Sequence, residues 1–383
     1  MNLFDVYPLF NITPVKAEGC NVWDSEGTKY LDLYGGHAVI SIGHSHPHYV
    51  GKISDQLSQI GFYSNSIQNP LQIELAEKLG KISGCEDYQL FLCNSGAEAN
   101  ENAIKLASFV TGKKKFISYK KGFHGRTSAA VALTDNPKII APVNETDNAI
   151  ILPFNDLEAT EKALKMGNVA GVIVEGIQGI GGIYVPEEGF LVALKRLTEK
   201  YGALLILDEI QSGYGRSGRF FAFQYTNVQP DLITVAKGMG NGFPIGGILI
   251  KSEIKPWFGM LGTTFGGNHL ACAAGIAVLD VIQDENLVEN SEKVGSYLME
   301  KLAEISSGYE IRGKGLMIGI ECGFPIKELR QKLLFDYGIF TGVSGLNIVR
   351  LLPPLNLTIH EADKFLQAFE EVYTDVSASL TEQ

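Results

Sequence analysis

The sequence has 383 residues, of which 45% are hydrophobic and 20% are charged. This balance is typical of a folded globular protein, and at about 150 residues per domain the length corresponds to roughly two or three domains. The 32 lysines and arginines and 43 aspartates and glutamates give a net charge of −11, which argues against general binding to nucleic acid or to an anionic membrane. No apolar run approaches the ~20 residues of a membrane span.

The start of the chain and its cysteines bear on the cellular compartment. The first residues, 1–14, contain two prolines and an aspartate, without the basic start and apolar stretch of a secretory signal. The five cysteines are scattered and form no CxxC pair: Cys20, Cys85, Cys93, Cys272 and Cys322. Their odd number and spacing argue against a disulfide framework or a zinc site, and we therefore expect a cytoplasmic protein.

Predicted strands and helices alternate along most of the chain. Two short strands are expected at 20–24 and 29–33, joined by a turn. Further apolar runs lie at 89–92, 115–118, 171–174, 203–207, 232–235 and 247–250, and helical spacing is found at 98–109 and 189–201. Continuous apolar strands separated by helices predict an α/β fold with a mostly parallel central sheet covered on both faces.

The C-terminal part has a different pattern. We expect a long helix over 270–302, short strands near 316–321 and 346–352, and a closing helix over 360–373. This pattern predicts a smaller α+β domain, with which the first strands of the chain would pair. The predicted organisation is an N-terminal segment 1–47 that packs with the small domain, a large cofactor-binding domain 48–280 and a small domain 281–383.

Polar residues follow three of the predicted strands, at the edge where open parallel sheets bind ligands. After Leu92, the run Asn94-Ser95-Gly96 leads into a helix, and free backbone amides there favour an anion such as phosphate. An ordinary strand-to-helix turn is the alternative. Asp208 follows five apolar residues, and a buried carboxylate needs a cationic or proton-donating partner. A helix cap or an ion pair would also satisfy Asp208.

The third strand end carries Lys237 at the start of a glycine-rich loop. Partial desolvation would lower the pKa of this lysine and free its amine for Schiff-base chemistry, whereas most lysines extend to water. The glycines after Lys237 do not have the spacing of a dinucleotide-binding loop. An anion site, a buried acid and a buried amine together match pyridoxal phosphate, which has a phosphate, a basic ring nitrogen and an aldehyde.

Further motifs surround these residues. They read Gly-His-Ser-His-Pro at 43–47, Asn-Ser-Gly-Ala-Glu-Ala at 94–99, Phe-His-Gly-Arg at 123–126, Asp-Glu-Ile-Gln-Ser-Gly-Tyr-Gly-Arg-Ser-Gly at 208–218, Ala-Lys-Gly at 236–238, Thr-Thr-Phe-Gly-Gly-Asn at 263–268 and Leu-Leu-Pro-Pro-Leu at 351–355. Their order over nearly the whole chain resembles the class III (ornithine-type) pyridoxal-phosphate aminotransferases. Within that class the closest similarity is to the acetylornithine aminotransferases. The histidines at 44, 46 and 48 belong to a segment that the family uses structurally, and no metal is expected.

The resemblance implies the fold type I architecture, pyridoxal phosphate as cofactor and a homodimer with active sites at the subunit interface. It implies that Lys237 forms the Schiff base and moves a proton, and that Asp208 pairs with the ring nitrogen. The other implied cofactor contacts are the amides of Gly96 and Ala97 to the phosphate, Phe123 and Ile210 on the two ring faces, Gln211 near the ring hydroxyl, and Thr264 reaching the partner subunit's phosphate.

The implied substrate contacts are Arg126 for the α-carboxylate of an acylated ornithine, Thr263 near the substrate, and Arg350 for glutamate or 2-oxoglutarate. The implied reaction moves the terminal amine of N-acetylornithine or N-succinylornithine to 2-oxoglutarate, in arginine biosynthesis. Three alternatives remain: ornithine or 4-aminobutyrate as donor, a fold type I enzyme that isomerises or decarboxylates, and a non-catalytic binding protein. The presence of both Lys237 and Asp208 argues against the last alternative.

One segment departs from the family. Residues 175–182 read Glu-Gly-Ile-Gln-Gly-Ile-Gly-Gly, where relatives usually have Glu-Pro-Val-Gln-Gly-Glu-Gly-Gly. The second glutamate, which in relatives pairs with the arginine aligned with Arg350, is replaced by Ile180. Arg350 must then stay unpaired, find another acid, or always contact a carboxylate. A donor with an additional carboxylate, such as N-succinylornithine, would suit a free arginine.

Overall fold

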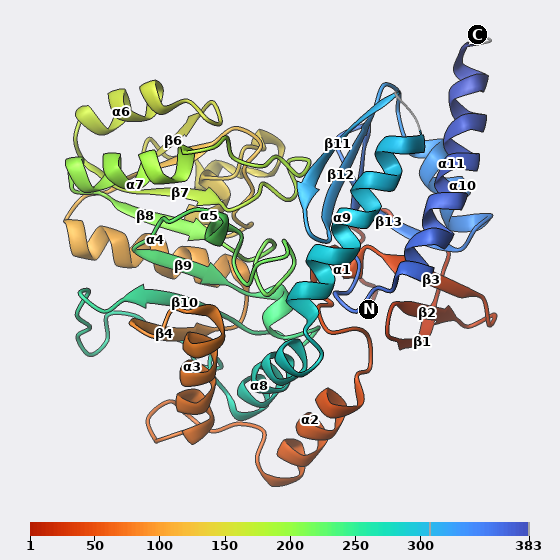
Figure 1. Cartoon of the computed structure of the whole chain (residues 1–383). Helices are drawn as coiled ribbons and strands as arrows, with labels where there is room; N and C mark the ends of the chain where they lie inside the picture. Colours follow the sequence, from red (N-terminus) through yellow and green to blue (C-terminus); the bar gives the residue numbers. More distant parts are fainter. Residues whose placement is uncertain (306–307, 382–383) are drawn as a thin grey trace.

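The structure is a computed structural model that describes residues 1–305 and 308–381, with side chains as far as residue 379. Its described part contains two seven-stranded sheets that lie side by side, each with its own helices (Figure 1). None of the helices in these ranges combines the length and the apolar character needed to cross a membrane.

The larger sheet is formed by the middle of the chain. Its strands lie in the order β4 (Tyr88–Cys93), β10 (Gly246–Lys251), β9 (Leu232–Val235), β8 (Leu204–Asp208), β7 (Val169–Glu175), β5 (Lys115–Tyr119) and β6 (Ala149–Leu152). Neighbours from β9 to β6 pair parallel, whereas β10 is antiparallel to both β4 and β9. The prediction of a mostly parallel sheet is therefore confirmed.

Helices cover both faces of this sheet. The helices of this part are α2 (Pro47–Gln59), α3 (Pro70–Ser83), α4 (Gly96–Thr111), α5 (Ser128–Ala132), α6 (Leu157–Lys165), α7 (Phe190–Tyr201) and α8 (His269–Asp284). Of these, α2 packs on α8. Successive residues of β8 point to opposite faces, as in any strand. Leu205 and Leu207 share a core cluster with Leu194 of α7. Ile206 packs in a second cluster with Ala103 of α4. Shorter helical turns are α1 (Gly35–Ala38), η1 (Pro137–Ile139), η2 (Pro142–Asn144), η3 (Ala222–Tyr225) and η4 (Lys237–Met239).

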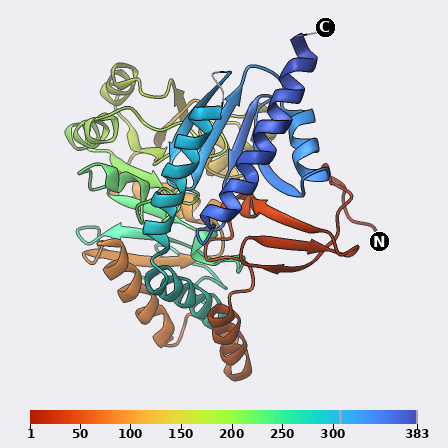
Figure 2. The same cartoon turned by 45° about the vertical axis from the view of Figure 1, so that its right-hand side comes forward.

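The smaller sheet joins the two ends of the chain. Its strands lie in the order β1 (Pro14–Glu18), β2 (Asn21–Asp24), β3 (Lys29–Leu33), β13 (Ile339–Ser344), β14 (Ile348–Leu351), β12 (Met317–Cys322) and β11 (Tyr309–Lys314). The parallel pairing of β3 with β13 places the first strands beside the last ones (Figure 2). The helices of this part are α9 (Leu287–Ile305), α10 (Lys327–Phe335) and α11 (Ile359–Thr381). The domain boundaries after residues 47 and 280 remain predictions.

The long helix expected over 270–302 is wrong as a single element. It is two helices, α8 and α9, separated by a break in which Asn286 has a φ of 51°. Asparagine tolerates this left-handed conformation better than most residues, and a helix cannot continue through it. The apolar periodicity continues on both sides of the break, which is why the pattern alone does not reveal it.

Candidate active site

A cavity of about 390 Å³ opens at the carboxyl edge of the larger sheet. Most of the residues that line it lie at or after the ends of β4, β5, β7, β8 and β9. Among the site residues expected from the sequence, those in the lining are Gly96, Ala97, Phe123, Arg126, Asp208, Ile210, Gln211 and Lys237. Thr263, Thr264 and Arg350 are not part of it. The strand ends therefore bring the predicted anion site, acid and amine to one cavity.

Asp208 is the last residue of β8 and is 3% exposed. Its Oδ2 accepts a hydrogen bond from Nδ2 of Asn100 at 2.8 Å and lies 2.8 Å from Nδ1 of His124. Its Oδ1 accepts from the backbone amide of Ile210 at 3.1 Å. These donors hold the carboxylate in one orientation and offset the cost of burying it.

Asn100 and His124 are positioning residues that the sequence analysis did not identify. Asn100 lies on the buried face of α4 and is fully buried, and its Nδ2 also donates to the carbonyl of His124 at 2.7 Å. The signal that was present is a polar residue next to Ala99 on an apolar helix face. The contact of Asn100 with Asp208, in contrast, depends on the tertiary packing of α4 against β8 and has no signal in the sequence.

Lys237 begins η4, one residue beyond the end of β9 at Val235, and is half-buried. Its amine has no hydrogen bond or ion pair among the residues that the structure describes. Burial lowers the pKa of Lys237 to about 8, although the charges of Asp208 and Glu175 act in the opposite direction. The backbone of Lys237 has a φ of 48°, a strained conformation for a residue with a side chain.

Glu175 ends β7 and aligns with Asp208 in the β7–β8 ladder. Its carboxylate accepts from the backbone amides of Phe123 at 3.0 Å and Gly179 at 2.8 Å. Burial raises the pKa of Glu175 to about 7. The side chain thus ties the segment that carries Phe123 to the turn before Ile180. The sequence analysis included Glu175 in a motif but gave it no role.

The N-terminus of α4 faces the cavity. Ser95 caps the helix by accepting from the amide of Glu98 at 3.2 Å. Within the described ranges, the amides of Gly96 and Ala97 have no acceptor, so both are available to an anion. A Cβ at position 96 would lie 2.9 Å from Cγ2 of Ile210, and glycine is therefore required there.

Two arginines expected to bind substrate differ in their surroundings. Arg126 is exposed on the cavity wall, and no described residue pairs with its guanidinium. Arg350 is 3% exposed and contacts the side chain of Gln211, which lines the cavity. Its acceptors are neutral oxygens: the carbonyls of Val343 at 3.0 Å and Gly179 at 3.2 Å, and Oε1 of Gln211 at 3.4 Å. Burial lowers the pKa of Arg350.

Thr263 and Thr264 are neighbours in the chain, and Thr263 contacts the cavity wall. Oγ1 of Thr263 accepts from Nδ2 of Asn94 at 3.2 Å, and Asn94 is itself in the cavity wall. Thr264 is exposed. The three histidines of the 43–48 segment each contact a different carboxylate. The pairs are His44 with Asp32 at 2.8 Å, His46 with Glu285 at 2.8 Å and His48 with Asp280 at 2.9 Å.

The family described as aminotransferase class III matches residues 5–373. The chain belongs to the class III aminotransferases. It is 41% identical over 369 residues to the acetylornithine aminotransferase of Archaeoglobus fulgidus, with 96% of each chain covered. It is also similar to the structure of acetylornithine aminotransferase from Elizabethkingia anophelis, with a TM-score of 0.83, 32% identity and 96% and 95% coverage. The ornithine aminotransferase of Toxoplasma gondii, with pyridoxal phosphate at partial occupancy in its active site, has a TM-score of 0.91, 30% identity and 97% and 92% coverage.

As a class III aminotransferase, the protein is a transaminase with the fold type I architecture and pyridoxal phosphate as its cofactor. These expectations from the sequence are confirmed. The cavity fits this group in three respects. The unpaired amine of Lys237 suits the aldehyde, the buried carboxylate of Asp208 suits the ring nitrogen, and the open amides of Gly96 and Ala97 suit the phosphate.

Proposed function

We propose that this class III aminotransferase moves the terminal amino group of N-acetylornithine or N-succinylornithine to 2-oxoglutarate. The products are the N-acyl-glutamate semialdehyde and glutamate, and the reaction serves arginine biosynthesis. The observation that carries the proposal is the 41% identity over 96% of both chains to an acetylornithine aminotransferase. The cofactor site alone does not specify the donor, because its groups face the cofactor.

The proposed roles of the cofactor-site residues follow from their positions in the cavity. Bound pyridoxal phosphate supplies an aldehyde that takes up amino groups and a ring that withdraws electrons from the reacting carbon. Nζ of Lys237, with a pKa of about 8, is the group that takes and returns a proton near neutral pH. Among the residues that line the cavity, Asp208 would hold the proton on the ring nitrogen, Phe123 and Ile210 would contact the ring, and Gln211 would bind its hydroxyl.

The donor would be bound through its carboxylates. Arg126, on the cavity wall without a partner in the described chain, would take the α-carboxylate, with Thr263 nearby. Arg350 would take a second carboxylate, that of 2-oxoglutarate or of the succinyl group. The charge of Glu175 acts on Arg350, but this carboxylate accepts its hydrogen bonds from the backbone amides of Phe123 and Gly179. The described hydrogen bonds of Arg350 are to neutral oxygens, and Ile180 cannot pair with it, so no described carboxylate hydrogen-bonds to this guanidinium. This absence supports N-succinylornithine as the better donor.

We propose further that the protein is a homodimer in which Thr264 reaches the partner's phosphate site. An exposed aromatic patch lies next to Thr264 and is formed by Phe62, Tyr63, Ile67 and Phe265. Its two segments are joined by Asn65, whose Nδ2 donates to the carbonyls of Thr263 at 3.3 Å and Gly266 at 3.0 Å. An exposed apolar surface of this kind is typical of a protein–protein interface. The five cysteines are buried free thiols, which supports a cytoplasmic location.

A donor screen tests the proposal. With 2-oxoglutarate as acceptor, kcat/KM is measured for N-acetylornithine, N-succinylornithine, ornithine and 4-aminobutyrate. We expect the acylated ornithines to exceed the other two by about a hundredfold, because the chain is 41% identical over 369 residues to an acetylornithine aminotransferase. Lys237→Ala should abolish turnover of every donor. Faster use of free ornithine or 4-aminobutyrate would overturn the assignment.

The choice of acyl group is tested at Ile180. In Ile180→Glu the new carboxylate can pair with Arg350, and we expect the preference for the succinyl over the acetyl donor to fall about tenfold. Ile180→Gln, which has the same size but no charge, is the control and should keep the donor ratio of the native enzyme. Equal or better use of the acetyl donor by the native enzyme would contradict the succinyl assignment.

A further inference from the structure

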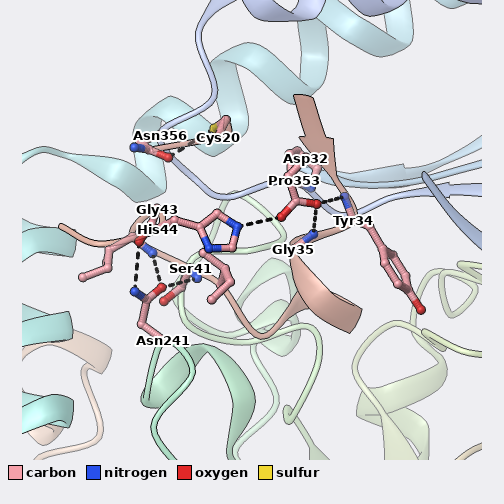
Figure 3. Close-up of polar contacts among 12 residues, drawn as sticks. Cys20, Asp32, Tyr34, Gly35, Ser41, Gly43, His44, Asn241, Pro353 and Asn356 are labelled. Atoms are coloured by element: carbon pink, nitrogen blue, oxygen red, sulfur yellow. Dashed lines mark hydrogen bonds and ion pairs between the residues drawn. The ribbon is translucent and has the colours of Figure 1, made fainter. Parts of the chain in front are cut away.

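The loop that carries Lys237 is tied to a distant segment of the chain through one buried side chain, Asn241. Its Oδ1 accepts from the backbone amides of Ser41 at 2.8 Å and Ile42 at 3.1 Å. Its Nδ2 donates to the carbonyl of Gly43 at 2.9 Å. Figure 3 shows this carboxamide pointing toward Ser41 and Gly43. Asn241 is 5% exposed, so water does not replace a lost bond easily.

Two further bonds join the same loop to the same segment. Oγ of Ser41 donates to the carbonyl of Gly238 at 2.7 Å. The hydroxyl of Tyr49 donates to the carbonyl of Gly240 at 2.7 Å. Together with Asn241, these bonds hold the loop at three of the four residues that follow Lys237.

The segment at 41–44 is itself fixed to the smaller sheet. The amide of Leu355 donates to the carbonyl of Ser41 at 2.7 Å. His44 exchanges backbone hydrogen bonds with Gly19 at 3.0 and 2.9 Å, and its Nε2 lies 2.8 Å from Oδ2 of Asp32. Figure 3 shows His44 and Asp32 beside the Asn241 contact. The loop that begins at Lys237 is thus bonded to a segment that is itself hydrogen-bonded to other parts of the chain.

The backbone of the loop needs such support. Lys237 and Asn241 have φ values of 48° and 47°, in the left-handed region that residues with a Cβ adopt at a cost. Strained conformations of this kind persist where the surroundings hold them. The five hydrogen bonds described above hold the loop in this conformation through the segment 41–49.

We propose that Asn241 is a positioning residue for Lys237, and that with Ser41 and Tyr49 it keeps the amine in the cavity beside Asp208. The proposal rests on the role of Lys237 in binding the cofactor. The loop would open toward water without these bonds, and the amine would lose both its orientation and its partly dry surroundings. Loss of the bonds should therefore change how the cofactor is bound and not merely how stable the protein is.

The test compares Asn241→Ala with Asn347→Ala in the holoenzyme. Asn347 also makes two hydrogen bonds, to Oε1 of Glu321 at 3.3 Å and to the carbonyl of Cys322 at 3.1 Å, but it lies in the turn between β13 and β14 of the smaller sheet. The dissociation constant of pyridoxal phosphate and the pH dependence of its visible absorption are measured. We expect Asn241→Ala to weaken cofactor binding about tenfold and to raise the apparent pKa of the absorption change by roughly one unit, because water enters around the lysine. Asn347→Ala should leave both quantities unchanged.

The groups that face Lys237 are the same in both variants. They are Asp208, Glu175, Arg350, Arg216 and His37. Ser41→Ala and Tyr49→Phe, which remove one hydrogen bond each, repeat the test with smaller shifts in the same direction if Asn241→Ala does not fold. A native protein without a lysine-dependent absorption band would refute the role of Lys237 itself. A native band that is unchanged in all three loop variants would overturn the inference about Asn241 and leave the proposed function intact.

Discussion

The carboxylate of Asp208 and that of its neighbour Glu209 are both buried, but they face different surroundings. Asp208 lines the cavity and contacts Asn100 and His124. Glu209 lies away from it and accepts from the hydroxyl of Ser212 at 2.6 Å and from two backbone amides of η3. This difference follows from the alternation of side chains along a strand end. The pair provides a test of one residue against a matched control.

Asp208→Asn should lower kcat/KM by about 10²–10³-fold, because the amide oxygen can still accept hydrogen bonds but no longer supplies a negative charge to the ring nitrogen. Steady-state kinetics with the preferred donor measures this loss. Glu209→Gln, which removes a buried charge outside the cavity, should stay within about threefold of the native rate. Equal losses in the two variants would mean that Asp208 acts through the fold and not on the cofactor.

At the scale of single residues, strand-end reasoning from the sequence identifies Asp208 and Lys237 and brings them to one edge of the sheet. It does not identify Glu175, His124 or Asn100. Their roles depend on which backbone amides and carboxylates come within reach after the chain has folded. Lone polar residues next to apolar ones are not specific enough to show this in the sequence.

Among the elements, apolar strands that are buried on both faces are the ones that the pattern predicts well. β9 has the bounds expected from the sequence, and β8 begins and ends one residue later than expected. The strands without a prediction, β1, β6, β11 and β13, are short or partly exposed, so their apolar signal is weak. The antiparallel direction of β10 also depends on a connection that periodicity does not encode.

Glu209, the residue directly after β8, should make the stability of the protein depend on pH. Burial raises the pKa of Glu209 to about 7, from an ordinary value of 4.5. A carboxyl with a raised folded pKa contributes stability that is fully present below the unfolded value and is lost as the pH rises through the folded value. As the pH rises between these two values, the free energy of unfolding of the native protein should fall by up to about 3 kcal/mol relative to that of Glu209→Gln. Urea unfolding at about pH 5 and about pH 8 measures this difference. Parallel pH profiles of the two proteins would contradict it.

At the scale of the whole molecule, the cavity depends on parts of the chain that are far apart in sequence. The smaller sheet pairs β3 with β13, and the segment that follows β3 reaches the lysine loop on the larger sheet. The pattern of strands and helices predicts two lobes and the pairing of the first strands with the smaller one. It does not predict the hydrogen bonds from the segment after β3 to the lysine loop, because contacts between such distant segments have no local signal. Relative movement of the two sheets would therefore be transmitted to Lys237.

The proposed homodimer makes a prediction about the aromatic patch. Phe265 is 59% exposed, and its ring centroid lies 5.3 Å from that of Phe62. A carboxylate in this patch would have to be buried on association, so Phe265→Asp should raise the dimer dissociation constant by about a hundredfold or more. Activity should fall with dimer concentration, because Thr264 of the partner would no longer reach the phosphate site. Light scattering after size exclusion, with activity assays over a dilution series, measures both effects. Leu346→Asp, at a 79% exposed position between β13 and β14, is the control and should remain a dimer. A stable Phe265→Asp dimer, or a fully active monomer, would show that the patch does not complete the active site.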